Sequence, residues 1–186
     1  MNYISHIDEI LEFNKKFVAN KQHETYSSTK YPNKKIAILS CMDTRLTELL
    51  PAALNFKNGD IKIIKNAGAV ITHPFGSVMR SLLVAIYQLD IEEILIIGHY
   101  DCGMQGLEPS ELIEKMQKRN IPKETLDLIG YSGIDINKWL KGFDNIEASV
   151  RETVNLIKKH PLVPKDVKVY GFIIDPTTGR LDKLDI

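Results

Sequence analysis

Residues 93–103 read EILIIGHYDCG, and this stretch decides the fold. Its first part, Glu93–Gly98, is a continuous apolar run of strand length. Strands that alternate apolar and polar residues have one solvent-exposed face, whereas a continuous run of apolar residues is typical of a strand covered on both faces. The polar residues after Gly98 therefore follow the carboxyl end of a buried strand.

Other segments repeat this pattern of strands and helices. Further strands are predicted over 35–40, 61–65 and 167–174, with a possible edge strand over Arg180–Ile186. Apolar residues at helical spacing predict helices over 4–20, 77–89, 109–119 and 146–159. A short helix containing Pro51 is expected over 46–55, a loop over 21–34 and short helical pieces over 120–143. Asp144 and Glu147 are expected to form a capping box. Alternating strands and helices favour an α/β fold with a mostly parallel sheet.

Composition excludes several classes of protein. A chain of 186 residues predicts a single domain over 1–186, with a helical arm over 1–20 and a core over 35–186. Lys and Arg total 24, as do Asp and Glu, so the basic excess of a nonspecific nucleic-acid binder is absent. No apolar run is long enough to span a membrane. The first residues are polar and two cysteines cannot make a disulfide scaffold, so we expect a cytoplasmic protein.

Two short motifs follow predicted parallel strands. Ser40–Arg45 (SCMDTR) follows the strand 35–40, and Gly98–Gly103 follows the strand 93–98. The carboxyl edge of such a sheet is where ligands bind. Cys41, His99 and Cys102 would supply two thiolates and one imidazole there, and three protein ligands with a vacant fourth position are the pattern of catalytic zinc.

Less specific interpretations of the same residues stay open. A single cysteine at a strand end is often a small buried apolar residue, and the two cysteines could form a disulfide. Asp43 and Arg45 could be an ordinary solvated ion pair. Cys41 could be a nucleophile, but a phosphatase-like loop places five residues between its cysteine and arginine, and here there are three.

Taken together, the motifs resemble the signature of the β-class carbonic anhydrases. The resemblance rests on Cys41-x-Asp43-x-Arg45, on Gly98-His99-x-x-Cys102-Gly103, on Lys65–Gly68 (KNAG, with Lys for the family's Arg) and on Gly171–Leu181 (GFIIDPTTGRL). The chain resembles the shorter bacterial members of this family in two respects, its short length and the Met104 that follows Cys102-Gly103.

The resemblance implies a fold and a reaction. The fold is a parallel four-stranded sheet flanked by helices, with an added edge strand. The reaction is reversible hydration of carbon dioxide by hydroxide on one Zn²⁺ per chain. Cys41, His99 and Cys102 would bind the metal. Asp43 would orient the hydroxide or, as a competing fourth ligand, occupy the metal, and Arg45 would hold Asp43 away.

Several points stay open under this resemblance. Carbonyl sulfide or carbon disulfide could be the substrate, or the chain could be a non-catalytic zinc protein. No substrate-binding residue is assigned. The family assembles as homodimers or larger homo-oligomers, so residues 1–20 would pack on a partner, although this helix could instead cover its own core. His73 or Tyr100 could relay the proton, or each could be a plain loop residue.

Overall fold

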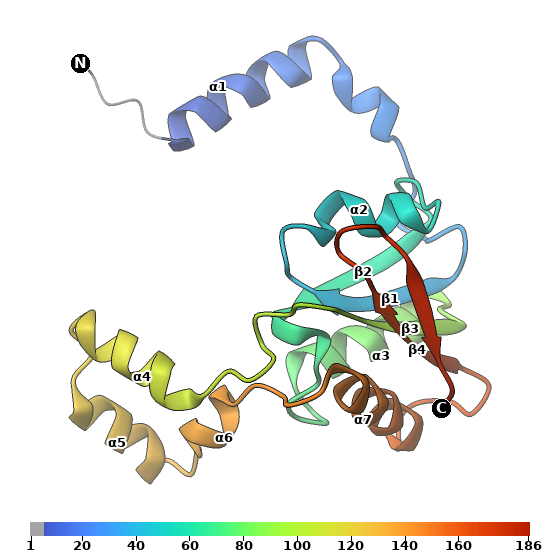
Figure 1. The fold of residues 1–186 in the computed structure, drawn as a ribbon. Coiled ribbons are helices and arrows are strands. Elements are labelled where there is room, and N and C mark those ends of the chain that lie inside the picture. Colours follow the sequence, from blue (N-terminus) through green and yellow to red (C-terminus); the bar gives the residue numbers. More distant parts are fainter. Residues whose placement is uncertain (1–5) are drawn as a thin grey trace.

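The computed structural model describes residues 6–186, and its centre is a five-stranded sheet in the order β2-β1-β3-β4-β5 (Figure 1). The first four strands in this order are parallel, and β5 runs antiparallel to β4. The strands are β1 (Ile36–Cys41), β2 (Ile61–Asn66), β3 (Glu93–His99), β4 (Lys168–Ile174) and β5 (Leu181–Leu184). The predicted α/β fold, with a mostly parallel sheet and an added edge strand, is confirmed.

The helices lie close to their predicted positions. They are α1 (His6–Ala19), α2 (Leu46–Ala53), α3 (Ser77–Leu89), α4 (Pro109–Lys118), α5 (Lys123–Tyr131), α6 (Ile136–Leu140) and α7 (Ile146–Lys159). Two short 3-10 helices are also present, Gln22–Tyr26, within the segment 21–34 predicted as a loop, and Ala67–Ala69, directly after β2. The first residues of the helix predicted over 4–20, including Ile4, lie outside the described residues. No helix between residues 6 and 186 combines the length and apolar character that a bilayer crossing requires.

Alternate residues of the central strands face two different layers. Leu39 of β1 and Ile96 of β3 pack with α3 and α7 on one face. Ile38 and Ile97, their neighbours in sequence, pack with α2 on the other face. All four side chains are fully buried. A strand buried on both faces has no polar side to alternate with, which explains the continuous apolar runs in the sequence.

Helix α7 starts one residue later than the capping box predicted. The N-cap is Asn145, not Asp144, and its side-chain oxygen accepts a hydrogen bond of 2.9 Å from the backbone N–H of Ala148. Asn145 has the extended backbone of an N-cap residue, which places its side chain over the first turn. Two adjacent polar residues can each cap a helix, so the sequence pattern did not distinguish them.

Two helical parts project from the body. Helix α1 extends away from the sheet layers, and α4, α5 and α6 form a second projection (Figure 1). None of the residues of α1 is buried, and Ile10 and Phe13 are both more than half exposed. Within the described chain, α1 therefore does not cover the core, although its sequence is amphipathic.

Glycines allow α7 to approach the sheet closely. A Cβ at Gly98 would lie 2.7 Å from Cδ1 of Ile146 and 2.9 Å from Cγ2 of Val150. We expect Gly98→Ala to lower the free energy of unfolding by about 1–3 kcal/mol, because the added methyl overpacks this contact. Gly130→Ala is the control, since nothing lies within 4 Å of its added Cβ in α5. Urea unfolding of both variants checks this; equal stability of the Gly98 variant and wild type would contradict it.

Candidate metal centre

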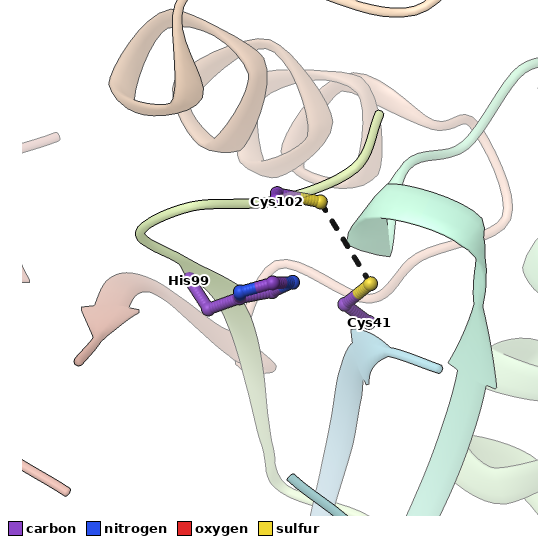
Figure 2. Close-up of side chains that lie close together, drawn as sticks. All are labelled: Cys41, His99 and Cys102. Carbon is purple, nitrogen blue, oxygen red and sulfur yellow. Dashed lines mark hydrogen bonds between the residues drawn. The ribbon is translucent and has the colours of Figure 1, made fainter. Parts of the chain in front are cut away.

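Three metal-ligating side chains meet at the carboxyl edge of the sheet. Cys41 ends β1, His99 ends the neighbouring strand β3, and Cys102 lies in the turn that follows (Figure 2). Their ligand atoms all lie within 4.8 Å of one another, and all three residues are buried. The structure thus brings together the three residues that the sequence singled out.

The imidazole of His99 has one ring nitrogen in use. Its Nδ1 lies 2.8 Å from the carbonyl oxygen of Tyr100, so Nδ1–H donates to that oxygen. Its Nε2 is buried with no hydrogen-bond partner. When the neutral imidazole carries its proton on Nδ1, the lone pair lies on Nε2, which is the atom free to bind a metal.

The two thiols form a close pair. The Cys41 and Cys102 sulfurs are 3.9 Å apart, and both cysteines are free, so the disulfide interpretation does not describe this structure. The contact with the Cys102 thiol lowers the pKa of Cys41, and burial acts in the opposite direction. The same contact and burial raise the pKa of Cys102. One sulfur is therefore already favoured as a thiolate, the form that binds metals.

A backbone N–H also supports the Cys41 sulfur. The backbone N–H of Gly68, in the short 3-10 helix after β2, donates to Cys41 Sγ at 3.4 Å. Gly68 has a φ of 81°, and a Cβ there would lie 3.0 Å from Phe143 and 3.2 Å from Met104. Positive φ and close packing together require glycine at this position. The KNAG stretch thus has a physical role beside the metal ligands.

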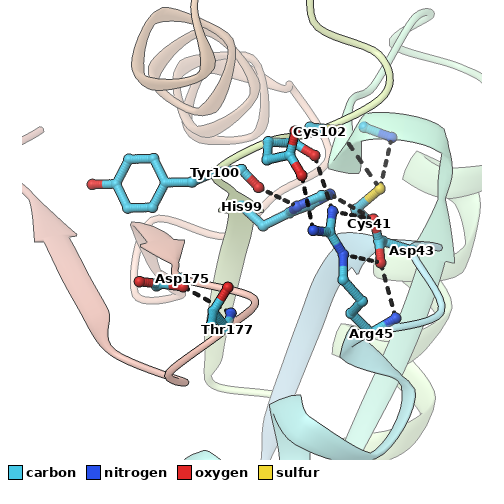
Figure 3. Close-up of polar contacts among 10 residues, drawn as sticks. Cys41, Asp43, Arg45, His99, Tyr100, Cys102, Asp175 and Thr177 are labelled. Atoms are coloured by element: carbon cyan, nitrogen blue, oxygen red, sulfur yellow. Dashed lines mark hydrogen bonds and ion pairs between the residues drawn. The ribbon is translucent and has the colours of Figure 1, made fainter.

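Asp43 and Arg45 lie beside this cluster (Figure 3). Arg45 Nε donates to Asp43 Oδ1 at 3.0 Å, and Nη2 donates to Asp43 Oδ2 at 2.8 Å. The backbone N–H of Arg45 donates to Asp43 Oδ1 at 2.9 Å. These bonds from Arg45 lower the pKa of Asp43 to about 2, so the carboxylate is ionised at neutral pH. Asp43 Oδ2 lies 3.8 Å from His99 Nε2, close to the atoms that would hold the metal.

Two features of this edge were not predicted from the sequence. Asp101 accepts hydrogen bonds from Arg45, and the Nζ of Lys65 is buried with no hydrogen-bond partner. Burial lowers the pKa of Lys65, whereas the charges of Cys41 and Asp43 act to raise it. The only sequence signal for Asp101 was a carboxylate between the two ligands of the His99-x-x-Cys102 turn.

The two residues considered for proton relay make contacts of their own. His73 Nδ1 accepts a hydrogen bond of 3.0 Å from the backbone N–H of Phe75. The hydroxyl of Tyr100 donates to Asp182 Oδ2 at 3.1 Å, and its ring points away from the metal ligands in Figure 3. The first contact lies within one loop, and the second joins the turn after β3 to strand β5.

The donor set fits a zinc ion. Two sulfurs and one unpartnered imidazole nitrogen are buried and converge, and the count of three protein ligands leaves a position for a further ligand. Thiolate and imidazole ligands together favour zinc among the common divalent metals.

Comparison with known proteins agrees with this site. The sequence model of the carbonic anhydrase family matches residues 36–181. "Putative carbonic anhydrase YtiB" of Bacillus subtilis is 55% identical, over 96% of each chain. The crystal structure of a β-carbonic anhydrase from Trichomonas vaginalis has a TM-score of 0.88 at 32% identity, over 97% of each chain. Carbon disulfide hydrolase of Acidithiobacillus thiooxidans is 27% identical, over 80% of this chain and 76% of that protein. The chain belongs to the β-class of the carbonic anhydrase family.

The donor set predicts metal content directly. We expect about one zinc per purified chain, and we expect Cys102→Ser to lose most of it on dialysis, because a neutral hydroxyl replaces a thiolate ligand. Met42→Ser is the control, since Met42 neighbours Cys41 but is exposed and outside the ligand cluster. Atomic absorption gives the metal content. Full zinc retention by Cys102→Ser would contradict the assigned ligand set.

Proposed function

We propose that the protein is a zinc-dependent carbonic anhydrase, a lyase that interconverts carbon dioxide and bicarbonate. The observation that carries the proposal is the Asp43–Arg45 pair beside three convergent ligand atoms, Cys41 Sγ, His99 Nε2 and Cys102 Sγ. A bound zinc ion supplies a Lewis acid that lowers the pKa of water and so yields a nucleophile near neutral pH. The protein side chains then have to orient that nucleophile and keep its position free.

Asp43 performs the orienting role. Its pKa of about 2 makes it a carboxylate at working pH, so it only accepts hydrogen bonds. An acceptor beside His99 Nε2 can hold the proton of the nucleophile and direct its lone pair toward carbon dioxide. The same negative charge makes Asp43 a possible competitor for the metal.

Arg45 controls that competition. Its side chain and backbone supply three hydrogen bonds to the two oxygens of Asp43. A bidentate arginine–carboxylate pair has fixed geometry as well as favourable charge. Arg45 therefore keeps Asp43 in the orienting position rather than on the metal.

Hydrolysis of carbon disulfide is the second candidate, favoured by the likeness to carbon disulfide hydrolase. The same three ligands and the same acceptor would serve it, because carbon disulfide has the linear geometry of carbon dioxide. Stopped-flow assays with carbon dioxide, carbonyl sulfide and carbon disulfide distinguish these activities. A non-catalytic zinc protein would need neither Asp43 nor Arg45, and both are present.

We also propose that the chain works as a cytoplasmic homodimer or larger homo-oligomer. Helix α1 supports this, because it carries exposed apolar side chains away from the core. Removal of residues 1–20 should then shift the species seen by analytical ultracentrifugation toward monomer.

Loss of Arg45 tests the pair. We expect Arg45→Ala to bind zinc normally but to lose most hydration activity, because Asp43 is then free to occupy the metal. The control is Arg180→Ala, which breaks another exposed Arg–Asp pair, with Asp182. Stopped-flow hydration and metal analysis are measured together. Wild-type turnover in Arg45→Ala would show that the pair has no such role.

The pH profile tests the competition independently. Two thiolates neutralise the charge of zinc, so water is acidified less than by a three-histidine site, where its pKa is about 7. We expect activity to be low near pH 7 and to rise several-fold by about pH 8.5. The pKa of about 2 excludes protonation of Asp43 as the cause.

Asp43→Asn separates the two roles of this carboxylate. The amide cannot compete for the metal as an anion, so we expect a flatter pH profile together with slow turnover from the loss of the charged acceptor. A wild-type profile that is flat from pH 6 to 9 would contradict the competition.

A further inference from the structure

The guanidinium of Arg45 has two bonded edges. One edge, formed by Nε and Nη2, faces Asp43. The other edge faces Asp101: Nη1 donates to its Oδ2 at 2.9 Å, and Nη2 donates to its backbone oxygen at 3.0 Å. A planar guanidinium held along two edges cannot rotate without breaking several bonds.

Asp101 occupies a fixed place in the metal-binding turn. It lies between His99 and Cys102 and has a positive φ of 54°. Arg45, which follows β1, therefore bridges to the turn that follows β3. The turn that supplies the candidate ligand Cys102 also supplies the second anchor of Arg45.

The exposure of this ion pair excludes a large effect on stability. The side chain of Asp101 is 86% exposed and that of Arg45 is 41% exposed. Exposed pairs contribute little to the stability of the fold. The effect of the pair on the orientation of Arg45 can be larger. A long, partly exposed arginine side chain has many rotamers, and a bond to Asp101 excludes most of them.

We infer that Asp101 is a positioning residue, which holds the Arg45 guanidinium so that its Nε–Nη2 edge stays on Asp43. This inference rests on the proposed function, since it assigns Asp101 to the control of Asp43. The side-chain oxygen of Asp101 bonds Nη1, which Asp43 does not use, so the two carboxylates do not compete for that donor. Without Asp101, Arg45 can turn toward solvent and release Asp43.

Two substitutions isolate the side chain of Asp101. Asp101→Gly removes it while permitting the positive φ and keeping the backbone oxygen. Asp101→Asn also tolerates this backbone conformation and keeps a neutral acceptor, so it serves as the conservative variant. Glu92→Gln is the matched control, because it removes a surface carboxylate paired with Lys35 at the amino end of β3.

The first readout is the side chain of Arg45 itself. Arg45 is one of five arginines, and Arg45→Ala identifies its Nε–H and Nη signals in ¹H–¹⁵N spectra. In wild type we expect slow rotation with distinct Nη signals, both metal-free and with zinc. In Asp101→Gly we expect these signals to average, while Asp101→Asn is intermediate and Glu92→Gln matches wild type. Unchanged Arg45 signals in Asp101→Gly would overturn the inference.

The second readout is turnover at equal zinc content. We expect Asp101→Gly to lower carbon dioxide hydration at pH 7 by about two- to five-fold, the range typical of an exposed pair, and less than Arg45→Ala does. Averaged Arg45 signals with wild-type turnover would overturn the positioning role. A wild-type protein that does not hydrate carbon dioxide would instead overturn the proposed function, and the Arg45 signals would still decide whether Asp101 anchors the guanidinium.

Discussion

The parallel pairing of β1 with β3 is the constraint on which the metal centre depends. The register pairs Ser40 with Ile97, so the next residues of both strands reach the sheet edge together. Neighbouring strands lie about 4.8 Å apart, which is close enough for side chains at their ends to converge on one ion. A slip of one residue would turn the buried side chains of β1 to the opposite face. The apolar residues that fix the register thereby also place Cys41 next to His99.

Most charged groups at this edge lie beside a group of opposite charge, which makes their partial burial possible. Two thiolates would match the charge of a divalent zinc ion, and Arg45 pairs with both Asp43 and Asp101. Unpaired charges are costly to remove from water, so a site of this kind needs each ion beside its partner. Lys65 is the exception among the described residues at this edge, because its buried Nζ has only the more distant charges of Cys41 and Asp43.

Much of the fold could be predicted because periodicity reports directly on burial. The strand Glu93–Gly98 and the helix 77–89 agree with the structure to within a residue. The helices within 120–143 could be predicted less well. Helices α5 and α6 are short, and α6 packs on α4 and α5 rather than on the sheet, so their apolar pattern is weak. The N-cap of α7 could not be predicted to the residue, because Asp144 and Asn145 are adjacent and Asp and Asn cap helices about equally well.

The candidate site could likewise be predicted only in part from the sequence. Cys41, His99 and Cys102 could be associated because each follows a recognisable strand. The contacts of Asp101 and of the Gly68 N–H could not, because they depend on where a loop backbone and a long side chain lie in space. Spacing along the chain identifies the residues that a sheet edge collects, but not the hydrogen bonds between its loops.

The separation of the metal centre from the larger core affects how the ion binds. The main cluster of buried residues, between the sheet and helices α3 and α7, contains none of the three ligands. The smaller cluster, on the α2 face of the sheet, contains Cys41 and Cys102. Apolar packing therefore holds two of the three ligand side chains, which reduces the conformational entropy that they would lose on binding an ion. In a zinc finger, by contrast, the free energy of metal binding drives folding. Here the larger core packs without the three ligands, so removal of a bound metal should leave that core folded.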